Sequence, residues 1–322
     1  MQEQDVITVE GLRKSYGPVK AVDGVTFQVR RGEIFGMVGP NGSGKTTTIE
    51  CIEGLRCPDE GRLHVLGLDP QKNYYELRER TGVQLQSANL PPRMRVEEAM
   101  DLFSVFYRHS TDYRPLLKEL GLEEKRRTFF SQLSGGQKQR LFVALALINR
   151  PEIVFLDELT TGLDPQARRA TWELVREIRE RGTTVFLTTH FMDEAERLCD
   201  RVLILDHGRV VALDSPQNLV SQLGMGTRIS FQVNGRIHSP GERGAGKPKE
   251  PVFNTALIGA LSGVQRVEQQ DEEVVIFGQG EGWIGDVIRA LEAEGVPFHD
   301  LRSEQATLED AFLSLTGQEM RD

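Results

Sequence analysis

The feature that most constrains this chain is a glycine-rich loop, GPNGSGKTTT, at residues 39–48. The loop matches the pattern G-x-x-x-x-G-K-[ST] at every fixed position and ends in Lys45 and Thr46. Glycines allow a backbone to turn its N–H groups toward phosphate oxygens without a Cβ clash, and the lysine adds a cation. An apolar run, EIFGMVG, precedes the loop and TTTIECIEGL follows it, which predicts a strand and a helix. The loop is therefore predicted to hold a nucleoside triphosphate at the start of a helix.

A second apolar run, IVFLDE at residues 153–158, ends in two adjacent carboxylates. Four consecutive apolar residues are typical of a strand that is buried on both faces. Asp157, at the end of this strand, is suited to coordinating Mg²⁺. Glu158 follows it and is suited to taking a proton from an attacking water. The two runs together predict the phosphate half and the catalytic half of one site.

Composition limits the classes of partner and the compartment. The 322-residue chain is 39% hydrophobic and has no apolar run long enough to span a bilayer. Its net charge of −9 argues against nucleic acid as a partner, because phosphate backbones require a basic surface. Cys51, Cys57 and Cys199 are spaced unlike a metal site, and MQEQDVITVE is unlike a secretion signal. We expect a cytoplasmic chain with free thiols.

The segment LSGGQKQR, residues 133–140, contains another glycine turn before an apolar helical run. Two phosphate-shaped turns with only one loop-plus-lysine site favour a head-to-tail dimer, in which the partner's LSGGQ turn closes each loop. With GPNGSGKT, LSGGQ and IVFLDE in this order, residues 5 to about 220 resemble the ATP-binding cassette (ABC) ATPases, the nucleotide-binding subunits of ABC transporters. The resemblance implies that the chain binds and hydrolyses ATP with Mg²⁺.

The resemblance also assigns catalytic roles to individual residues. Glu158 would be the general base, and His190, which ends VFLTTH, would bond the γ-phosphate and orient Glu158. A histidine after a strand is usually structural, and only the accompanying motifs favour this role for His190. Gln86, in VQLQSANL, would contact Mg²⁺ and the attacking water; Gln84 is the competing choice. Thr46, Gln86 and Asp157 would hold the metal.

The nucleotide contacts and the dimer contact follow from the same resemblance. Tyr16, in LRKSYG, would stack on adenine, although a single tyrosine at this place is also compatible with plain packing. Asp164, in TTGLDP, would lie in the turn that crosses the dimer interface. The nucleotide-binding residues would be Tyr16, Gly39, Pro40, Asn41, Gly42, Ser43, Gly44, Lys45, Thr46 and Thr47, with Ser134, Gly135, Gly136 and Gln137 from the partner copy.

One position departs from the family pattern. The family usually has proline after the catalytic glutamate, whereas this chain has Leu159. Proline would fix the backbone where Glu158 leaves the strand. We hypothesise that Leu159 loosens this turn and slows ATP turnover.

The order of elements predicts an α/β fold with two domains. Residues 5–224 would form a P-loop ABC cassette, with a mixed sheet core, an antiparallel β part and a helical subdomain at about 90–148. Residues 225–322 would form a small α+β accessory domain, with a mobile loop at about 236–252. Its β-α-β-β-α-β order predicts a ferredoxin-like domain.

The last segment, SEQATLEDAFLSLTG, resembles the end of daunorubicin-resistance-type and other ABC-2 exporter ATPases, although an amphipathic helix capped by Thr307 would look the same. The resemblance implies a drug, lipid or other hydrophobic cargo and integral membrane permease subunits on a separate chain. A second ATPase copy, most simply a homodimer, would complete the assembly at the inner face of the cell membrane. The alternatives are a soluble ABC ATPase acting on an assembly scaffold or the ribosome, and a nucleotide-binding switch with negligible hydrolysis.

Overall fold

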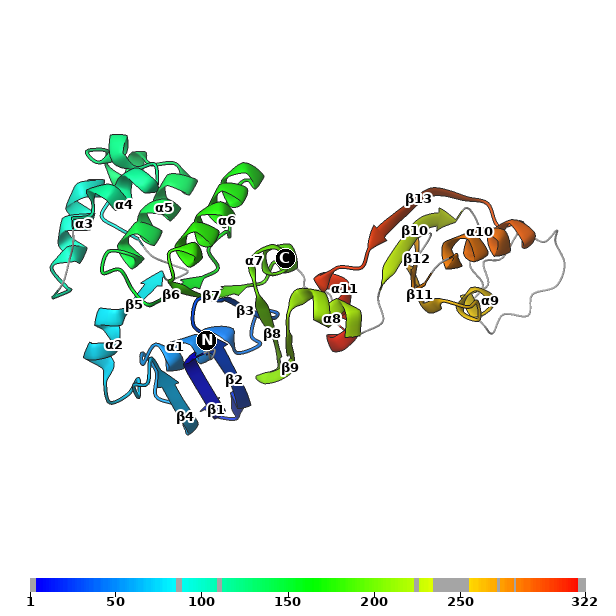
Figure 1. Cartoon of the computed structure of the whole chain (residues 1–322), viewed down its shortest axis with the longest axis horizontal. Helices are drawn as coiled ribbons and strands as arrows, with labels where there is room; N and C mark the ends of the chain where they lie inside the picture. The colour runs from blue at the N-terminus through cyan, green and yellow to red at the C-terminus, as the bar shows by residue number, and fades with distance from the viewer. Residues whose placement is uncertain are drawn as a thin grey trace. The chain divides into compact units, whose positions relative to one another are not determined.

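Figure 1 shows the computed structural model of the chain, which describes residues 4–84, 89–108, 112–222, 226–233, 255–270, 273–280 and 282–317. The chain divides into two compact units, Met1–Pro216 and Gln217–Gly317. This division precedes the domain boundary that the sequence predicts after residue 224. Within the described residues, every helix is too short or too polar to traverse a lipid bilayer. Gln86 and the loop predicted at about 236–252 lie outside the described residues.

A six-stranded sheet forms the centre of the first unit, in the order β5-β6-β7-β3-β8-β9. Its strands are β3 (Ile34–Val38), β5 (Thr81–Gln84), β6 (Ile153–Asp157), β7 (Thr184–Thr189), β8 (Arg201–Asp206) and β9 (Arg209–Asp214). Neighbours are parallel except for β9, which is antiparallel to β8. Strands β6, β7 and β3 are adjacent, so their carboxyl ends lie side by side at one edge of the sheet.

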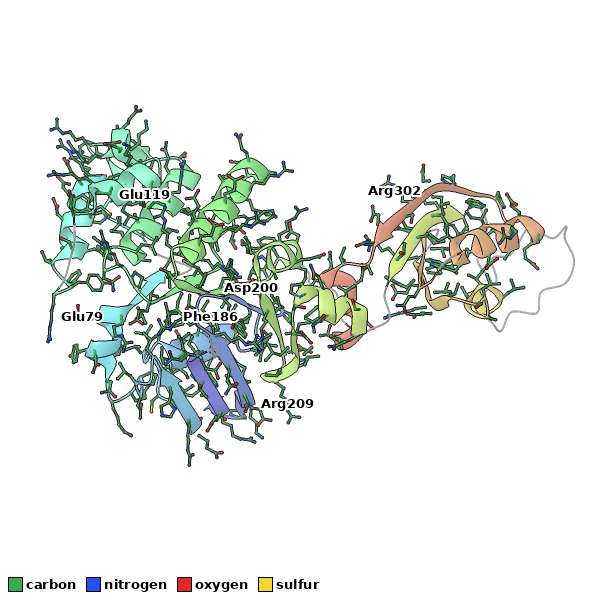
Figure 2. All side chains as sticks on the ribbon, in the orientation of Figure 1. Glu79, Glu119, Phe186, Asp200, Arg209 and Arg302 are labelled. Carbon is green, nitrogen blue, oxygen red and sulfur yellow. The ribbon has the colours of Figure 1, made fainter. Side chains whose placement is uncertain are left out.

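A smaller antiparallel sheet packs against the main sheet through a shared core. Its strands are β1 (Asp5–Tyr16), β2 (Val19–Arg30) and β4 (Glu60–Val65), in the order β2-β1-β4. The ring centroid of Phe35 in β3 lies 5.4 Å from that of Phe27 in β2 and 5.4 Å from that of Phe186 in β7. Figure 2 labels Phe186 within the first unit. Helix α1 (Lys45–Ile52) buries its apolar side in the same core. The phosphate loop is thereby fixed at both ends by buried elements.

Helices form the part of the first unit for which the sequence predicts a helical subdomain (Figure 1). The helical elements of that part are α3 (Val96–Ser104), α4 (Arg114–Glu119), α5 (Gly135–Ala146), and the short 3₁₀ turns Glu123–Lys125 and Phe130–Gln132. Helix α2 (Tyr74–Arg80) precedes the predicted range. A separate apolar core lies among the helices of that part, and its buried residues include Val96, Met100, Leu117 and Leu141. Helix α5 is anchored on the main sheet, where a Cβ added at Gly82 of β5 would lie 1.9 Å from the Ala146 carbonyl oxygen.

Two further helices follow strands of the main sheet. Helix α6 (Pro165–Glu180) follows β6 and lies beside α5, and α7 (Met192–Leu198) follows β7 (Figure 1). Helix α6 buries Trp172, Val175 and Ile178 along one face, as the spacing of an amphipathic helix requires. Helices α6 and α7 therefore begin at the same sheet edge as the phosphate loop, close to the ends of β6 and β7.

The second unit has its own antiparallel sheet, in the order β11-β12-β10-β13. Its elements are β10 (Thr227–Val233), α9 (Thr255–Gly259), β11 (Val264–Gln270), β12 (Glu273–Gly278), α10 (Trp283–Ala293), β13 (Phe298–Gln305) and α11 (Leu308–Thr316). Helices α9 and α10 cover one face of the sheet through Ile258, Trp283 and Val287. Val220 of α8 (Pro216–Gln222) packs with Phe277 of β12 in a smaller cluster. The unit thus carries an apolar core separate from that of the cassette.

The end of the second unit is held by a buried carboxylate. Thr307 and Asp310 form a capping box at the start of α11, in which each side chain bonds the other's backbone. Asp310 also pairs with Arg228 of β10 at 2.7 Å, while Glu304 pairs with the same guanidinium at 2.9 Å. The threonine that the sequence predicts as a helix cap therefore takes part in fixing α11 to the sheet.

Candidate functional site

The glycine loop joins the end of β3 to the start of α1, as predicted. Gly44 adopts a φ of 104°, and a Cβ at this residue would lie 2.3 Å from the Ala21 carbonyl oxygen. A Cβ at Gly39 would lie 2.1 Å from the Leu205 carbonyl oxygen. Only glycine fits at these two positions without a backbone shift. At Gly42, by contrast, nothing lies within 4 Å of an added Cβ, so this side of the loop is open.

Helix α1 begins without a side-chain cap, because its N-cap is Gly44. The first amide that donates within the helix is Thr48 N, which bonds Gly44 O at 2.9 Å. The N–H groups that precede Thr48 have no acceptor within the helix, as in the first turn of any α-helix. They lie at the positive end of the helix dipole. Thr46, at this turn, is exposed. The arrangement fits a phosphate group, which supplies the missing acceptors.

Lys45 lies along the loop, where its Nζ donates to the carbonyl oxygens of Gly39 at 2.7 Å and Pro40 at 3.1 Å. The side chain is 6% exposed. Burial lowers the pKa of Lys45, while Glu158 and Asp157 act in the opposite direction. A buried ammonium bonded only to neutral carbonyls is poorly balanced, and a phosphate group on the loop would supply its counter-charge.

Asp157 ends β6, directly beside the end of β7. Its carboxylate accepts a hydrogen bond from the hydroxyl of Thr188. Burial raises the pKa of Asp157, and the neighbouring charge of Glu158 adds to the effect, while the Thr188 bond and Lys45 oppose it. Two adjacent carboxylates in a half-buried site favour a divalent cation, which relieves their repulsion. Hard oxygen donors of this kind are the ligands that Mg²⁺ prefers.

Glu158 leaves the strand in a strained backbone conformation. Its φ is +48°, in the left-handed region that non-glycine residues rarely adopt. The conformation is held because Glu158 N donates to Thr188 O at 3.0 Å and Glu158 O accepts from Thr161 N at 3.3 Å. The side chain is 10% exposed. Such strain, held by the surrounding backbone, is typical of a side chain that must be aimed at a substrate.

His190 follows β7 and faces Glu158. Its Nδ1 lies 3.5 Å from Glu158 Oε1. This is an ion-pair distance but not a well-formed hydrogen bond, and within the described ranges Nδ1 is buried without a hydrogen-bond partner. The imidazole packs against the ring of Phe191 with 4.1 Å between centroids. The structure thus brings together Lys45, Asp157, Glu158 and His190, which the sequence places in three separate motifs.

The LSGGQ turn forms the start of α5. Ser134 is the N-cap: its Oγ accepts from Gln137 N at 3.3 Å, and Gln137 Oε1 accepts from Ser134 N at 3.0 Å. Ser134 and Gly135 are exposed, whereas Gly136 and Gln137 are half-buried. A Cβ added at Gly136 would lie 3.4 Å from the Ala167 Cβ in α6, so the starts of α5 and α6 are in contact.

Asp164 caps the start of α6. Its carboxylate accepts from Gln166 N at 3.0 Å and Ala167 N at 2.9 Å, and Pro165 occupies the first helical position. The residue is exposed on the surface that also carries the start of α5. Its assignment to a dimer interface stays a prediction.

Two further residues were considered as ligands from the sequence, Tyr16 and Gln84. Tyr16 ends β1 with 42% of its surface exposed, and the Arg56 guanidinium lies 5.2 Å from its ring centroid. Gln84, the competing choice for Gln86, is the last residue of β5 and is 4% exposed. Because Gln84 is buried in the sheet, the prediction stays with Gln86, outside the described residues.

Sequence reasoning missed three residues around the site. Thr188 bonds Asp157, Phe191 packs on His190, and Glu194 of α7 accepts a hydrogen bond from Trp172 Nε1 at 3.1 Å. Burial raises the pKa of Glu194, while the nearby hydroxyls of Thr189 and Thr160 oppose the effect. Thr188 could have been found from the adjacency of the two strand ends. Glu194 carries no such signal, because nothing in FMDEAERLCD separates a buried glutamate from an exposed one.

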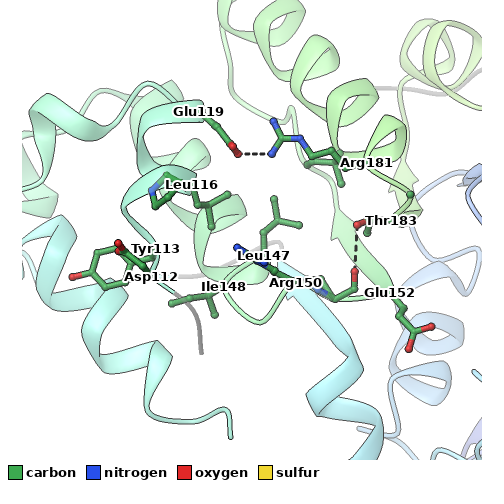
Figure 3. A pocket seen from close by; sticks show the side chains of 14 residues that line it. Asp112, Tyr113, Leu116, Glu119, Leu147, Ile148, Arg150, Glu152, Arg181 and Thr183 are labelled. Atoms are coloured by element: carbon green, nitrogen blue, oxygen red, sulfur yellow. Dashed lines mark hydrogen bonds and ion pairs between the residues drawn. The ribbon is translucent and has the colours of Figure 1, made fainter. Parts of the chain in front are cut away.

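A cavity of about 430 Å³ lies elsewhere in the first unit (Figure 3). It is lined by Leu116 of α4, Leu147 and Ile148 after α5, and Thr183 before β7. Arg181 pairs with Glu119 across it. Because Thr183 precedes β7, the cavity lies toward the amino ends of the strands, whereas the predicted nucleotide residues lie at the carboxyl ends.

Comparisons with known proteins show which family the chain is similar to. A family model described as ABC transporter matches residues 22–161. The Nod factor export ATP-binding protein I of Ralstonia nicotianae is 38% identical, covering 98% of this chain and 95% of the relative. The daunorubicin resistance ATP-binding protein DrrA3 of Streptomyces coeruleorubidus is 35% identical, and the match covers 98% of this chain and 97% of the relative.

Solved structures share the fold of the first unit. An ATP-binding subunit of an ABC transporter superposes with a TM-score of 0.62 at 32% identity, over 68% of this chain and 93% of that one. A dimeric bacterial ABC transporter cassette superposes with a TM-score of 0.57 at 29% identity, over 65% of this chain and 98% of that one.

The phosphate loop and the acidic strand end, on this mixed sheet, define a P-loop ATPase of the ATP-binding cassette class. The relatives that match this chain over nearly its full length also show its role. This chain belongs to the ATP-binding subunits of ABC transporters, and it is an ATPase coupled to transport. The prediction of the family and of ATP as the nucleotide is confirmed.

Proposed function

We propose that this chain powers an exporter that moves a drug, lipid or other hydrophobic compound through a permease on a separate polypeptide. The observation that carries the proposal is the full-length similarity to ATPases named for Nod factor export and daunorubicin resistance, which extends through the second unit. The same relatives do not favour a soluble ABC ATPase acting on a scaffold or the ribosome.

In this proposal the residues at the sheet edge divide the chemistry among them. The open loop and the start of α1 bind the phosphates, and Lys45 moves from the loop carbonyls to the β- and γ-phosphates. Glu158 accepts the proton of the attacking water, while His190 contacts the γ-phosphate and holds Glu158. Mg²⁺, held by Thr46, Asp157 and Gln86, would neutralise charge on the phosphates. Tyr16 stacks on the adenine ring.

The site becomes complete when two copies meet head to tail. The LSGGQ turn presents Ser134, Gly135, Gly136 and Gln137 to the partner's nucleotide, and the start of α5 adds a positive dipole end. Asp164 lies on the adjoining start of α6, which suits contact with the other copy. The similarity to a dimeric cassette supports this arrangement.

Exposed apolar side chains on α2 and at the end of α3 fit a permease contact. Tyr75 is 84% exposed, Val105 75% and Phe106 67%. The two elements are neighbours, because Arg108 N donates to Glu79 Oε2 at 3.1 Å (Figure 2). Large apolar side chains gathered on a surface mark protein contact sites. Docking there would place the chain at the inner face of the membrane.

We propose a ferredoxin-like fold for the second unit. Its element order is β-α-β-β-α-β, and its strand order β11-β12-β10-β13 separates the strands of each β-α-β crossover by one antiparallel strand. This split β-α-β arrangement supports the assignment. A rigid accessory unit of this kind suits a bracing role in the assembly.

The test is the capture of partners from membranes of the source organism. Tagged Glu158→Gln protein, incubated with ATP and detergent-solubilised membranes, should retain the closed dimer and co-purify a polytopic membrane protein in near-equal amount. The matched control is the Glu158→Gln, Phe106→Glu double variant, which should lose the membrane protein and keep the dimer. Recovery of ribosomal or scaffold proteins instead of a membrane protein would contradict the exporter.

A further inference from the structure

A three-membered stack lies beside the candidate base. The imidazole of His190 packs on the ring of Phe191, with 4.1 Å between centroids and 41° between planes. The guanidinium carbon of Arg168, in α6, lies 4.4 Å from the centroid of the same ring. We infer that Phe191 and Arg168 are positioning residues, which hold the imidazole of His190 against Glu158. The inference rests on the proposed function of His190.

The stack supplies a restraint that His190 otherwise lacks. Its Nδ1 is 3.5 Å from Glu158 Oε1 and has no hydrogen-bond partner among the described residues, so none of them fixes the ring by a strong bond at this nitrogen. Rotation of an imidazole about its second side-chain torsion is soft, because that torsion has broad minima. The Phe191 ring, tilted 41° from the imidazole at 4.1 Å between centroids, occupies space into which the imidazole would rotate. Phe191 therefore limits the directions in which the ring nitrogens of His190 can point.

Phe191 and Arg168 are themselves held in place. Phe191 N donates to Thr189 Oγ1 at 3.0 Å, which fixes the backbone between β7 and α7. Arg168 Nη1 lies 3.8 Å from Asp193 Oδ2, while Nε of Arg168 is buried and has no hydrogen-bond partner in the part of the chain that the structure describes. A guanidinium with a buried, unbonded nitrogen is retained on the face of an aromatic ring, where the ring's negative face compensates its charge.

The stack also reaches the surface that carries Asp164. Arg168 N donates to Asp164 O at 2.9 Å, so Arg168 stands on the first turn of α6. The chain of contacts thus runs from the first turn of α6 to Arg168, Phe191, His190 and Glu158. A displacement of the α6 start can therefore alter the position of His190 through packed side chains alone.

A second cation–π pair offers a matched control. The guanidinium of Arg197, in α7, lies 5.6 Å from the ring centroid of Trp172 in α6. This pair joins α6 to α7, whereas the Arg168–Phe191 pair joins α6 to the N-cap residue of α7. Arg197→Met therefore removes a cation–π contact of the same kind from α6 and α7, away from His190.

The first experiment measures ATP hydrolysis of the full chain in four single variants. Phe191→Leu and Arg168→Met should each lower kcat about 2- to 30-fold, the range for losing such a contact, with KM for ATP unchanged. Phe191→Tyr retains the aromatic ring, so its kcat should equal that of the wild type. Arg197→Met should also have the wild-type kcat. Unchanged kcat in Phe191→Leu, or an equal loss in Arg197→Met, would overturn the inference.

The second experiment places Phe191→Leu in a His190→Ala background and follows single turnovers with γ-labelled ATP. If Phe191 acts through His190, its substitution causes no further loss of turnover rate once the imidazole has been removed. If Phe191 has a separate structural role, its substitution lowers the rate by the same factor in both backgrounds. We expect the double variant to match His190→Ala, and additive losses would refute positioning. Wild-type turnover in His190→Ala alone would instead refute the proposed role of His190, and the inference with it.

Discussion

At the scale of single residues, the candidate site is governed by how Glu158 leaves its strand. The left-handed φ of +48° is held by backbone bonds to Thr188 and Thr161. Leu159 follows and is 4% exposed, so its side chain packs in the core where the family usually has proline. The buried leucine side chain helps to hold the turn in place. It does not fix the φ angle of residue 159, as the ring of a proline would.

Restoring proline tests whether this freedom limits turnover. We expect Leu159→Pro to raise kcat about two- to fivefold, the gain that a conformational restriction of this size produces. The loss of a buried leucine should lower the free energy of unfolding by about 2 kcal/mol. Steady-state ATPase rates and denaturant unfolding measure the two effects separately. An unchanged kcat would remove Leu159 as a cause of slow turnover.

At the scale of elements, the strands and helices of the site were predictable because each has a single physical signature. Strands β3 and β6 are short apolar runs, as strands covered on both faces must be. The sequence alone did not indicate contacts that depend on which elements become neighbours. Phe191 contacts Arg168, and Glu194 accepts a hydrogen bond from Trp172, only because α6 packs beside α7 and its N-cap residue. Gly82 is in close contact with Ala146 only because α5 packs on β5.

Helix α1 ends on a buried carboxyl group, and this gives a pH-dependent stability. Glu53 is 7% exposed; burial, then the charges of Asp157 and Glu50, raise its pKa from 4.5 to about 8. A carboxyl with a raised pKa contributes stability below pH 4.5, and this contribution is lost as the pH rises toward 8. A helix C-terminus also disfavours a negative charge.

Glu53→Gln should remove this dependence. Between pH 5 and pH 8, without nucleotide, the wild type should lose on the order of 3 to 4 kcal/mol of unfolding free energy that the variant retains. Urea unfolding of both proteins at several pH values measures the difference. Glu10→Gln, at an exposed position of β1, should follow the wild type. Parallel curves for wild type and Glu53→Gln would show that Glu53 ionises normally.

At the scale of the whole molecule, the order of motifs identified the cassette, because the loop and the acidic strand meet at one sheet edge and LSGGQ lies between them in the chain. The second unit was harder to predict, since short strands and helices outside a functional motif carry only weak periodicity. Its antiparallel sheet and its separate core are now described. The two compact units divide at Pro216, whereas composition placed the boundary after residue 224.

We expect the LSGGQ turn of a second copy to complete each ATP site. Sedimentation velocity of Glu158→Gln tests this dimer directly, with Mg²⁺ and either ATP or ADP. The protein should be a dimer with ATP and a monomer with ADP, and the ATP dimer should be lost when Ser134→Arg is added. A Glu158→Gln protein that binds ATP and stays monomeric, or a dimer that survives Ser134→Arg, would show that the LSGGQ turn of a second copy does not complete the site.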